Sequence, residues 1–156
     1  MKRSRPKSIL WFERFFFLSL GIELLNEYMT WPVMLEEIHW ESSSYMMLWS
    51  AIIALSLLLW YFLAIKAKAW ARWVQIILAG MGAIFLLIEI GSILAPAIED
   101  GNPTHVVWDN MIWPETFTFL YVLVVVTNLV ATYFLFRPDA VKWFDDKQIA
   151  IDTVFD

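Results

Sequence analysis

Carboxylate and amide side chains recur inside apolar segments of the chain, where they could bind a cation or carry a proton. In the first such segment, Ser19, Glu23 and Glu27 are spaced four residues apart. This spacing places them on one face of a helix, with Asn26 beside them. Inserting a charged group into a membrane costs at least about 2.5 kcal/mol of free energy. Charged residues that occur there therefore usually face the interior of a helix bundle or water. The pattern predicts an intramembrane polar site.

The third and fourth apolar segments add polar groups at a similar depth. Glu89 shares a helix face with Gln75, and Tyr121 shares one with Asn128. At about 1.5 Å per residue, Glu27, Glu89 and Tyr121 each lie about 24 Å from the basic end of their segment. We therefore expect an outward-facing pocket and not a continuous pore. The predicted site residues are Glu23, Asn26, Glu27, Glu89, Tyr121 and Asn128.

If Glu23, Glu27 and Glu89 converge with no Lys or Arg at that level, the three carboxylates cannot all stay charged in a medium of low dielectric constant. Either some are protonated or a cation lies among them. Oxygen ligands favour Ca²⁺ or Mg²⁺, or Na⁺ and H⁺ in a transporter. In the alternative interpretation, Glu27 and Glu89 reach the outer interface and are solvated. Glu23 is then protonated and hydrogen-bonded to Asn26 or Asn128.

Two segments without Lys or Arg, around residues 30–44 and 95–116, contain one histidine each. His39 with Glu37, and His105 with Asp109, could meet and hold Zn²⁺ or Cu²⁺. No spacing of the H-E-x-x-H kind supports this metal site, and the alternative is that these are ordinary solvated surface residues.

Long apolar segments must position these residues. Hydrophobic residues make up 60% of the 156-residue chain and aromatic residues 17%, which exceeds the usage of soluble domains. A segment of roughly 20 apolar residues can cross a bilayer as a helix. Four segments meet this length, at about residues 9–29, 44–65, 70–95 and 116–136. The sequence predicts an all-α polytopic membrane protein with a four-helix transmembrane bundle.

The basic residues predict its orientation. All 11 Lys and Arg residues fall before or at the start of the first segment, between the second and third, or after the fourth. By the positive-inside rule, both termini are cytoplasmic. We expect a transmembrane domain over residues 1–137 and a cytoplasmic amphipathic tail over 138–156, which docks on the bundle or on a partner.

Aromatic residues accompany the basic clusters. Trp11, Trp70, Trp73 and Trp143 lie near them, and indoles prefer the headgroup region, so we expect membrane anchors. The pattern R-P-x-x-x-x-W-F occurs twice, at residues 5–12 and 137–144. Each copy suits a helix that starts with proline in the inner interface.

The chain also resembles small four-helix bacterial inner-membrane proteins of uncharacterised function. The resemblance rests on the opening R-P-x-S-x-x-x-F-E, from Arg5 to Glu13, on a Trp-bearing start of the third helix, and on the ending F-R-P-x-x-x-x-W-F, from Phe136 to Phe144. It implies a bacterial inner-membrane location and no particular activity.

Three classes of function remain. No nucleophile, nucleotide or dinucleotide motif occurs, and we expect a non-enzymatic accessory subunit without a cofactor. Its partners are the lipid bilayer and another membrane protein or a second copy, and the few basic residues give no support to nucleic-acid binding. A small cation or proton transporter or channel that uses the acidic pocket is the alternative. The second alternative is a metal-binding sensor or enzyme at the outer loops.

Overall fold

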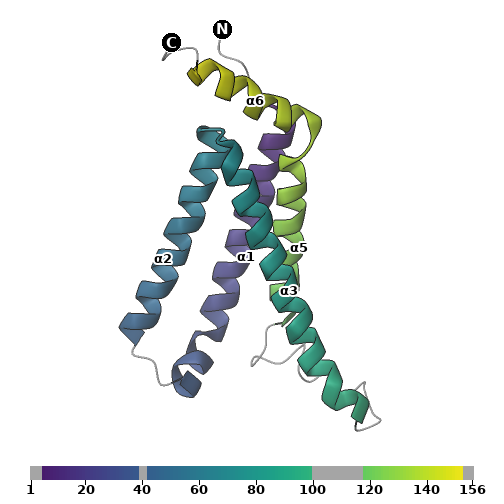
Figure 1. The fold of residues 1–156 in the computed structure, drawn as a ribbon. Helices are drawn as coiled ribbons and strands as arrows, with labels where there is room; N and C mark the ends of the chain where they lie inside the picture. The colour runs from purple at the N-terminus through teal and green to yellow at the C-terminus, as the bar shows by residue number, and fades with distance from the viewer. Residues whose placement is uncertain (1–4, 39–41, 100–117, 153–156) are drawn as a thin grey trace.

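The computed structural model describes residues 5–38, 42–99 and 118–152, and every regular element in these ranges is helical. The α-helices are α1 (Lys7–Ile38), α2 (Ser42–Trp60), α3 (Ala69–Glu99), α5 (Thr118–Leu135) and α6 (Pro138–Asp152); the π-helical segment η1 (Tyr61–Ile65) continues α2. Four long helices extend from one end of the molecule, and α6 lies across that end (Figure 1). The predicted all-α class is confirmed.

Each predicted segment forms a helix, although the bounds differ. α1 and α3 continue past Pro32 and Pro96, where a proline removes one backbone donor without ending the helix. Met46–Ile65 and Ala69–Ile88 are long and apolar enough to cross a membrane, and α5 with α6 gives a third candidate across a 61° bend. α1 is not among these candidates, because Glu23, Asn26 and Glu27 lower its hydropathy. The four-crossing bundle stays a prediction.

The three basic clusters lie together in space. The start of α1, the hinge between η1 and α3, and α6 all lie at one end of the molecule (Figure 1). We call it the basic end, because it carries the described basic residues Arg5, Lys7, Arg14, Lys66, Lys68, Arg72, Arg137, Lys142 and Lys147. These residues lie at one end because successive long helices run in alternating directions along the chain.

The apolar core is concentrated at the basic end, where the two R-P-x-x-x-x-W-F copies meet. α1 begins directly after Pro6 and α6 begins at Pro138, which confirms that each copy starts a helix. Phe12 and Phe144, the last residues of the copies, are fully buried in the same cluster. Trp143 is only 8% exposed. Its predicted role as a membrane anchor is therefore wrong, because α6 turns its apolar face onto the other helices.

A carboxylate joins the two helix starts. The Ser8 hydroxyl donates to Asp139 Oδ1 at 2.6 Å, and the Ser8 backbone N–H donates to Oδ2 at 3.2 Å. The first N–H groups of a helix lack partners within it, and the positive end of the helix dipole favours an anion. Asp139 lies in the first turn of α6 and caps α1. The Ser8 hydroxyl lowers the pKa of Asp139, and the N–H groups of Ser8, Asp139 and Ala140 lower it further.

The turn from η1 into α3 is tight. Lys66 N donates to Tyr61 O at 3.0 Å and Lys68 N donates to Phe62 O at 2.9 Å. Between them Ala67 adopts a φ of 50°, the left-handed conformation that commonly ends a helix. This geometry turns the chain directly from α2 into α3 at the basic end.

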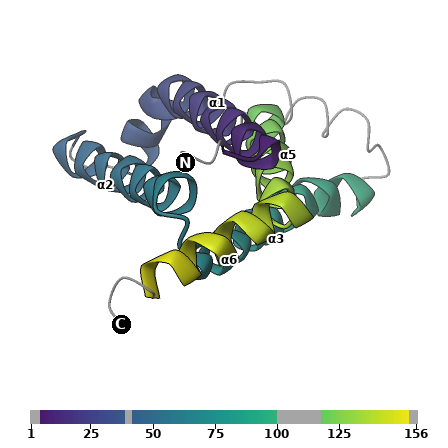
Figure 2. The same cartoon turned by 90° about the horizontal axis from the view of Figure 1, so that it is seen from above.

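The helices pack unequally. α1 lies along α5, and α3 packs against α5 and α6, whereas α2 contacts the other described elements mainly through η1. Seen from the basic end, α2 stands to one side and α6 crosses above α3 (Figure 2). A space therefore remains among α1, α2 and α3 away from the core.

We predict that Asp139→Ala lowers the free energy of unfolding by about 1 kcal/mol at pH 7, the usual value of a helix cap. Because the folded protein holds the pKa of Asp139 below its ordinary value, the ionised carboxylate stabilises the fold above that ordinary value, about 3.9. The stabilisation is lost as the pH falls through the lowered pKa. Thermal unfolding in detergent from pH 7 to pH 3 should show the two proteins converging.

Asp145→Ala is the matched control, because Asp145 is an exposed aspartate on the same helix. It should change stability by less than about 0.5 kcal/mol at any pH. An equal loss for Asp139→Ala at pH 7 and pH 3 would show that the carboxylate charge does not cap α1.

Candidate functional site

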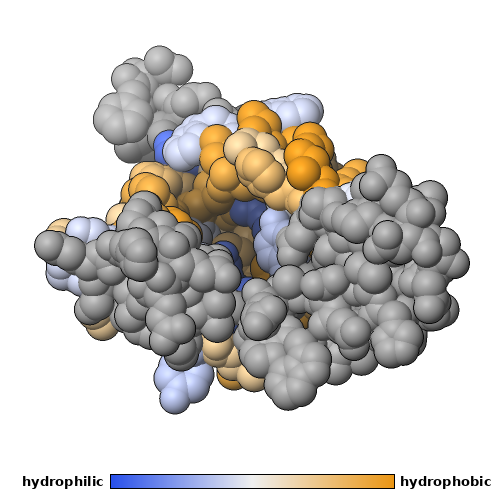
Figure 3. All heavy atoms as spheres, turned by 90° about the horizontal axis from the view of Figure 1, so that it is seen from below, coloured by the Kyte–Doolittle hydropathy of each residue, from blue (hydrophilic) through white to orange (hydrophobic). Residues whose placement is uncertain are grey.

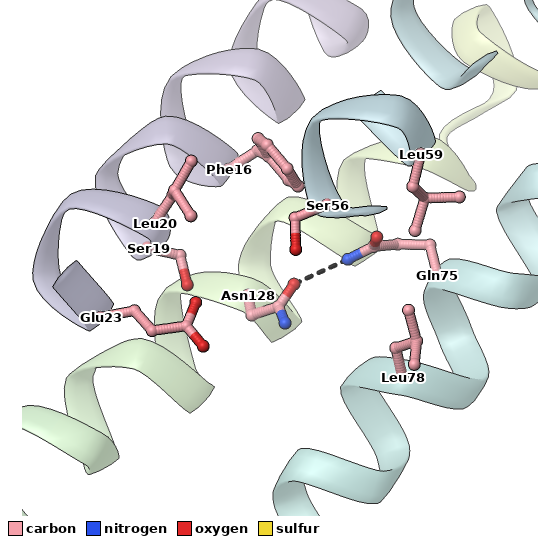
Figure 4. Close-up of a pocket in the computed structure, with 9 residues that line it drawn as sticks. All are labelled: Phe16, Ser19, Leu20, Glu23, Ser56, Leu59, Gln75, Leu78 and Asn128. Atoms are coloured by element: carbon pink, nitrogen blue, oxygen red, sulfur yellow. Dashed lines mark hydrogen bonds between the residues drawn. The ribbon is translucent and has the colours of Figure 1, made fainter. Parts of the chain in front are cut away.

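A polar cavity of about 190 Å³ lies among α1, α2, α3 and α5. Its polar side chains point toward one another from four helices (Figure 4). The lining residues are Phe16, Ser19, Leu20 and Glu23 of α1, Ser56 and Leu59 of α2, Gln75 and Leu78 of α3, and Asn128 of α5. This set contains a carboxylate, two amides and two hydroxyls, but no Lys, Arg or His.

The inward face of α1 changes character along its length. Ile9, Phe12 and Phe16 are buried in the core, and Ser19 and Glu23 continue the same face at steps of three and four residues. Ser19 is buried, and Glu23 is half-buried where it lines the cavity. The cavity therefore begins where the face of α1 changes from apolar to polar residues.

Gln75 organises the opposite wall. Its Nε2 donates to Asn128 Oδ1 at 2.7 Å and to Thr132 Oγ1 at 3.3 Å, while the Thr132 hydroxyl donates to the Asn128 backbone carbonyl at 2.8 Å. Gln75 is 2% exposed. A buried amide without partners costs free energy, so these bonds fix how α3 and α5 are aligned.

Two side chain to backbone bonds hold the neighbouring helices. The Ser19 hydroxyl donates to the Val124 carbonyl at 3.0 Å, which joins α1 to α5. The Tyr121 hydroxyl donates to the Gly82 carbonyl at 3.4 Å, which joins α5 to α3. Small and polar residues at such contacts are typical of helices that pack in a membrane. The Trp60 ring at the end of α2 contacts the Phe17 ring of α1, with centroids 5.3 Å apart.

The structure brings two of the six predicted site residues to the cavity. Glu23 and Asn128 line it, whereas Asn26 and Glu27 are half-buried on α1 and do not line it. Tyr121 instead bonds α3, and Glu89 lies in α3 but its side chain is outside the described set. The polar lining lies nearer the basic end than the predicted level, by one turn for Glu23 against Glu27 and by about two turns for Asn128 against Tyr121.

The proposed metal ligands cannot be compared with the structure. His39, His105 and Asp109 lie outside the described residues, and Glu37 lies in α1 with its side chain outside them. Within the described part of the chain, no three His, Asp or Glu side chains are grouped to hold a metal ion.

Three polar lining residues, Ser19, Gln75 and Ser56, are not among the predicted site residues. Ser19 and Gln75 lie on the predicted polar faces of α1 and α3, and the long side chain of Gln75 reaches Asn128. Ser56 lies on α2, for which no site residue was predicted. The Ser56 hydroxyl is one of few polar groups in an apolar helix. An isolated polar residue of this kind is the sequence feature that could have indicated its place in the site.

The hollow is visible from the end of the molecule opposite the basic end. Hydrophilic side chains show within it, and hydrophobic residues border them (Figure 3). Carboxylate, amide and hydroxyl oxygens without a basic neighbour are suited to a cation or a proton. The cavity therefore surrounds one carboxyl group, that of Glu23, with neutral side chains that can form hydrogen bonds.

A second cavity of about 460 Å³ adjoins the first between α2 and α3. Its lining is almost entirely apolar: Ile52, Leu55, Ser56, Leu58, Leu59 and Phe62 from α2 and η1, and Trp70, Val74 and Leu78 from α3. Ser56, Leu59 and Leu78 line both cavities. We call the second cavity the α2–α3 groove.

Comparisons of the chain with protein-family models, curated proteins and solved structures find no match. Within the described residues, two helices are long and apolar enough to cross a membrane, or three if α5 and α6 form one bent span. The Glu23 carboxylate lies beside them on α1.

We predict that Gln75→Leu lowers the free energy of unfolding by about 1–2 kcal/mol, because Asn128 Oδ1 and Thr132 Oγ1 lose their shared donor. Thermal unfolding in detergent measures the change. Ser50→Ala is the control, since Ser50 is exposed on α2, and it should leave the unfolding temperature unchanged. Equal stability of Gln75→Leu and the wild type would exclude the amide network as a determinant of helix alignment.

Proposed function

We propose that the chain crosses a bacterial inner membrane four times, through α1, α2 with η1, α3 and α5, with both termini cytoplasmic. The gathering of the described basic residues at one end supports this orientation. Trp11, Trp70 and Trp73 are about half exposed close to that end, where indoles prefer to lie. α6 then lies in the cytoplasmic interface against the helix ends.

We propose that the protein is a non-enzymatic accessory subunit that binds a transmembrane helix of another membrane protein. The observation that carries this proposal is the loose attachment of α2, which contacts the rest of the described protein mainly through η1. A membrane helix gains little by burying leucine away from lipid, and close contact between small residues drives association instead. α2 has a surface of small residues that a partner helix could contact.

The face of α2 away from the groove fits this role. Ser50 and Ala54 are exposed on it, and neither of them lines the α2–α3 groove. Small residues four apart let two helix backbones approach closely, and a serine hydroxyl can bond across the contact. We call these two residues the small-residue face of α2.

A second candidate function rests on the polar cavity. Glu23 lies there among Ser19, Ser56, Gln75 and Asn128, with no basic side chain in the lining. An ionised carboxylate in this setting favours a bound cation, and a protonated one can release its proton. The second proposal is thus a cation or proton site that serves a small transporter or channel.

We predict that the tagged protein, purified from its native membrane in mild detergent, carries a different membrane protein at a fixed ratio, measured by native mass spectrometry. Ala54→Leu should remove most of this partner, because the longer side chain separates the helix backbones. Its own unfolding temperature should stay within a few degrees of the wild type, since Ala54 is exposed.

The control is Leu87→Ala, which changes the same number of carbon atoms at an exposed position on α3 and should leave the partner bound. A homo-oligomer that Ala54→Leu dissociates would replace the accessory role with self-association. A lone chain that binds nothing would overturn the accessory proposal and favour the second candidate.

A further inference from the structure

The polar cavity and the α2–α3 groove adjoin each other between α2 and α3. Ser56, Leu59 and Leu78 line both, so the two cavities share a wall across α2 and α3. Their volumes are about 190 and 460 Å³, and together they fall within the roughly 300–1,000 Å³ of small-molecule sites. The composite space is polar at one end and apolar at the other.

The polar end is suited to a donor or a cation. Gln75 Nε2 already donates to Asn128 Oδ1, and the Ser19 hydroxyl already donates to a backbone carbonyl. The Glu23 carboxylate is then the strongest acceptor in the lining, and it has no Lys, Arg or His beside it there. An ammonium group supplies both the opposite charge and several N–H donors.

The apolar end is suited to an alkyl chain. Its lining runs along α2 and η1 from Ile52 to Phe62, which is roughly 15 Å at 1.5 Å per residue. Ser56 lies where the groove meets the polar cavity, and Trp70 supplies an indole at the basic end of α3. A flexible chain could follow this length between two helices that contact each other little.

We infer that the two cavities form one binding site for a single-chain amphiphile with a primary ammonium head group. The head lies beside Glu23 and the alkyl chain lies in the α2–α3 groove. This inference rests on the second function proposed above, in which the Glu23 cavity is a ligand site, and it names the ligand class. The argument for this ligand does not use the partner proposed for the small-residue face of α2.

The test uses the full chain in nanodiscs with three probes. Dodecylamine has the head and the tail, propylamine has the head with a short chain, and dodecanoate has the same tail with the opposite charge. Binding is measured by calorimetry and by the shift in unfolding temperature, and partitioning of each probe into nanodiscs without protein is measured and subtracted. We expect dodecylamine to bind at least tenfold more tightly than either other probe.

Two variants test the two ends of the site separately. Glu23→Gln should reduce dodecylamine binding at least tenfold by removing the charge, while Asp145→Asn, which removes an exposed carboxylate charge on α6, should not. Leu55→Trp should fill the groove and weaken dodecylamine without affecting propylamine. Leu55 is 65% exposed, so this variant keeps the test valid if Glu23→Gln fails to fold.

The outcomes separate the two proposals. Equal binding of propylamine and dodecylamine, both dependent on Glu23, would overturn the amphiphile site and leave the cation site standing. Equal binding of dodecylamine and dodecanoate, unaffected by Glu23→Gln, would show apolar partitioning only and overturn both. Absence of binding by all three probes would also overturn the amphiphile site.

Discussion

The joint at the basic end is the constraint on which the rest of the structure depends. Phe12 and Phe144 are fully buried there, Asp139 caps α1 from the start of α6, and the Arg72 guanidinium lies 4.7 Å from the Phe144 ring centroid. In lipid, apolar side chains gain little from burial against each other, so close packing and polar contacts must hold helices together. This protein places most of its close apolar packing at one end.

Anchoring at one end explains the polar cavity at mid-length. Beyond Phe16 the inward face of α1 becomes Ser19 and Glu23, groups that need polar partners and cannot pack as a dry core. The amide pair Gln75 and Asn128 meets them from the other side, where it also fixes α3 against α5. α2 contributes Ser56 to the polar lining, and its Trp60 ring contacts the Phe17 ring of α1 nearer the basic end.

The sequence predicts the helices and their common basic end well, because both depend on the hydropathy and charge of short segments that can be read directly along the chain. It predicts the cavity only in part. The positions of Glu23 and Asn128 in the cavity follow from helical spacing. The pairing of Gln75 with Asn128 depends on how far α3 and α5 are shifted along each other, and the rise per residue within one helix does not determine that shift. The R-P-x-x-x-x-W-F copies likewise mark two helix starts, yet their meeting through Ser8 and Asp139 and the burial of Trp143 depend on the turn at Arg137.

The two proposed roles both act on α2, and this connects them. One side of α2 forms a wall of the groove through Leu55 and Leu59, and the other presents Ser50 and Ala54. A chain lying in the groove would hold α2 at a set distance from α3, and a partner helix on the opposite side would favour one such distance. Because binding free energies couple reciprocally, a ligand that favours the partner-bound position of α2 must bind more tightly when the partner is present.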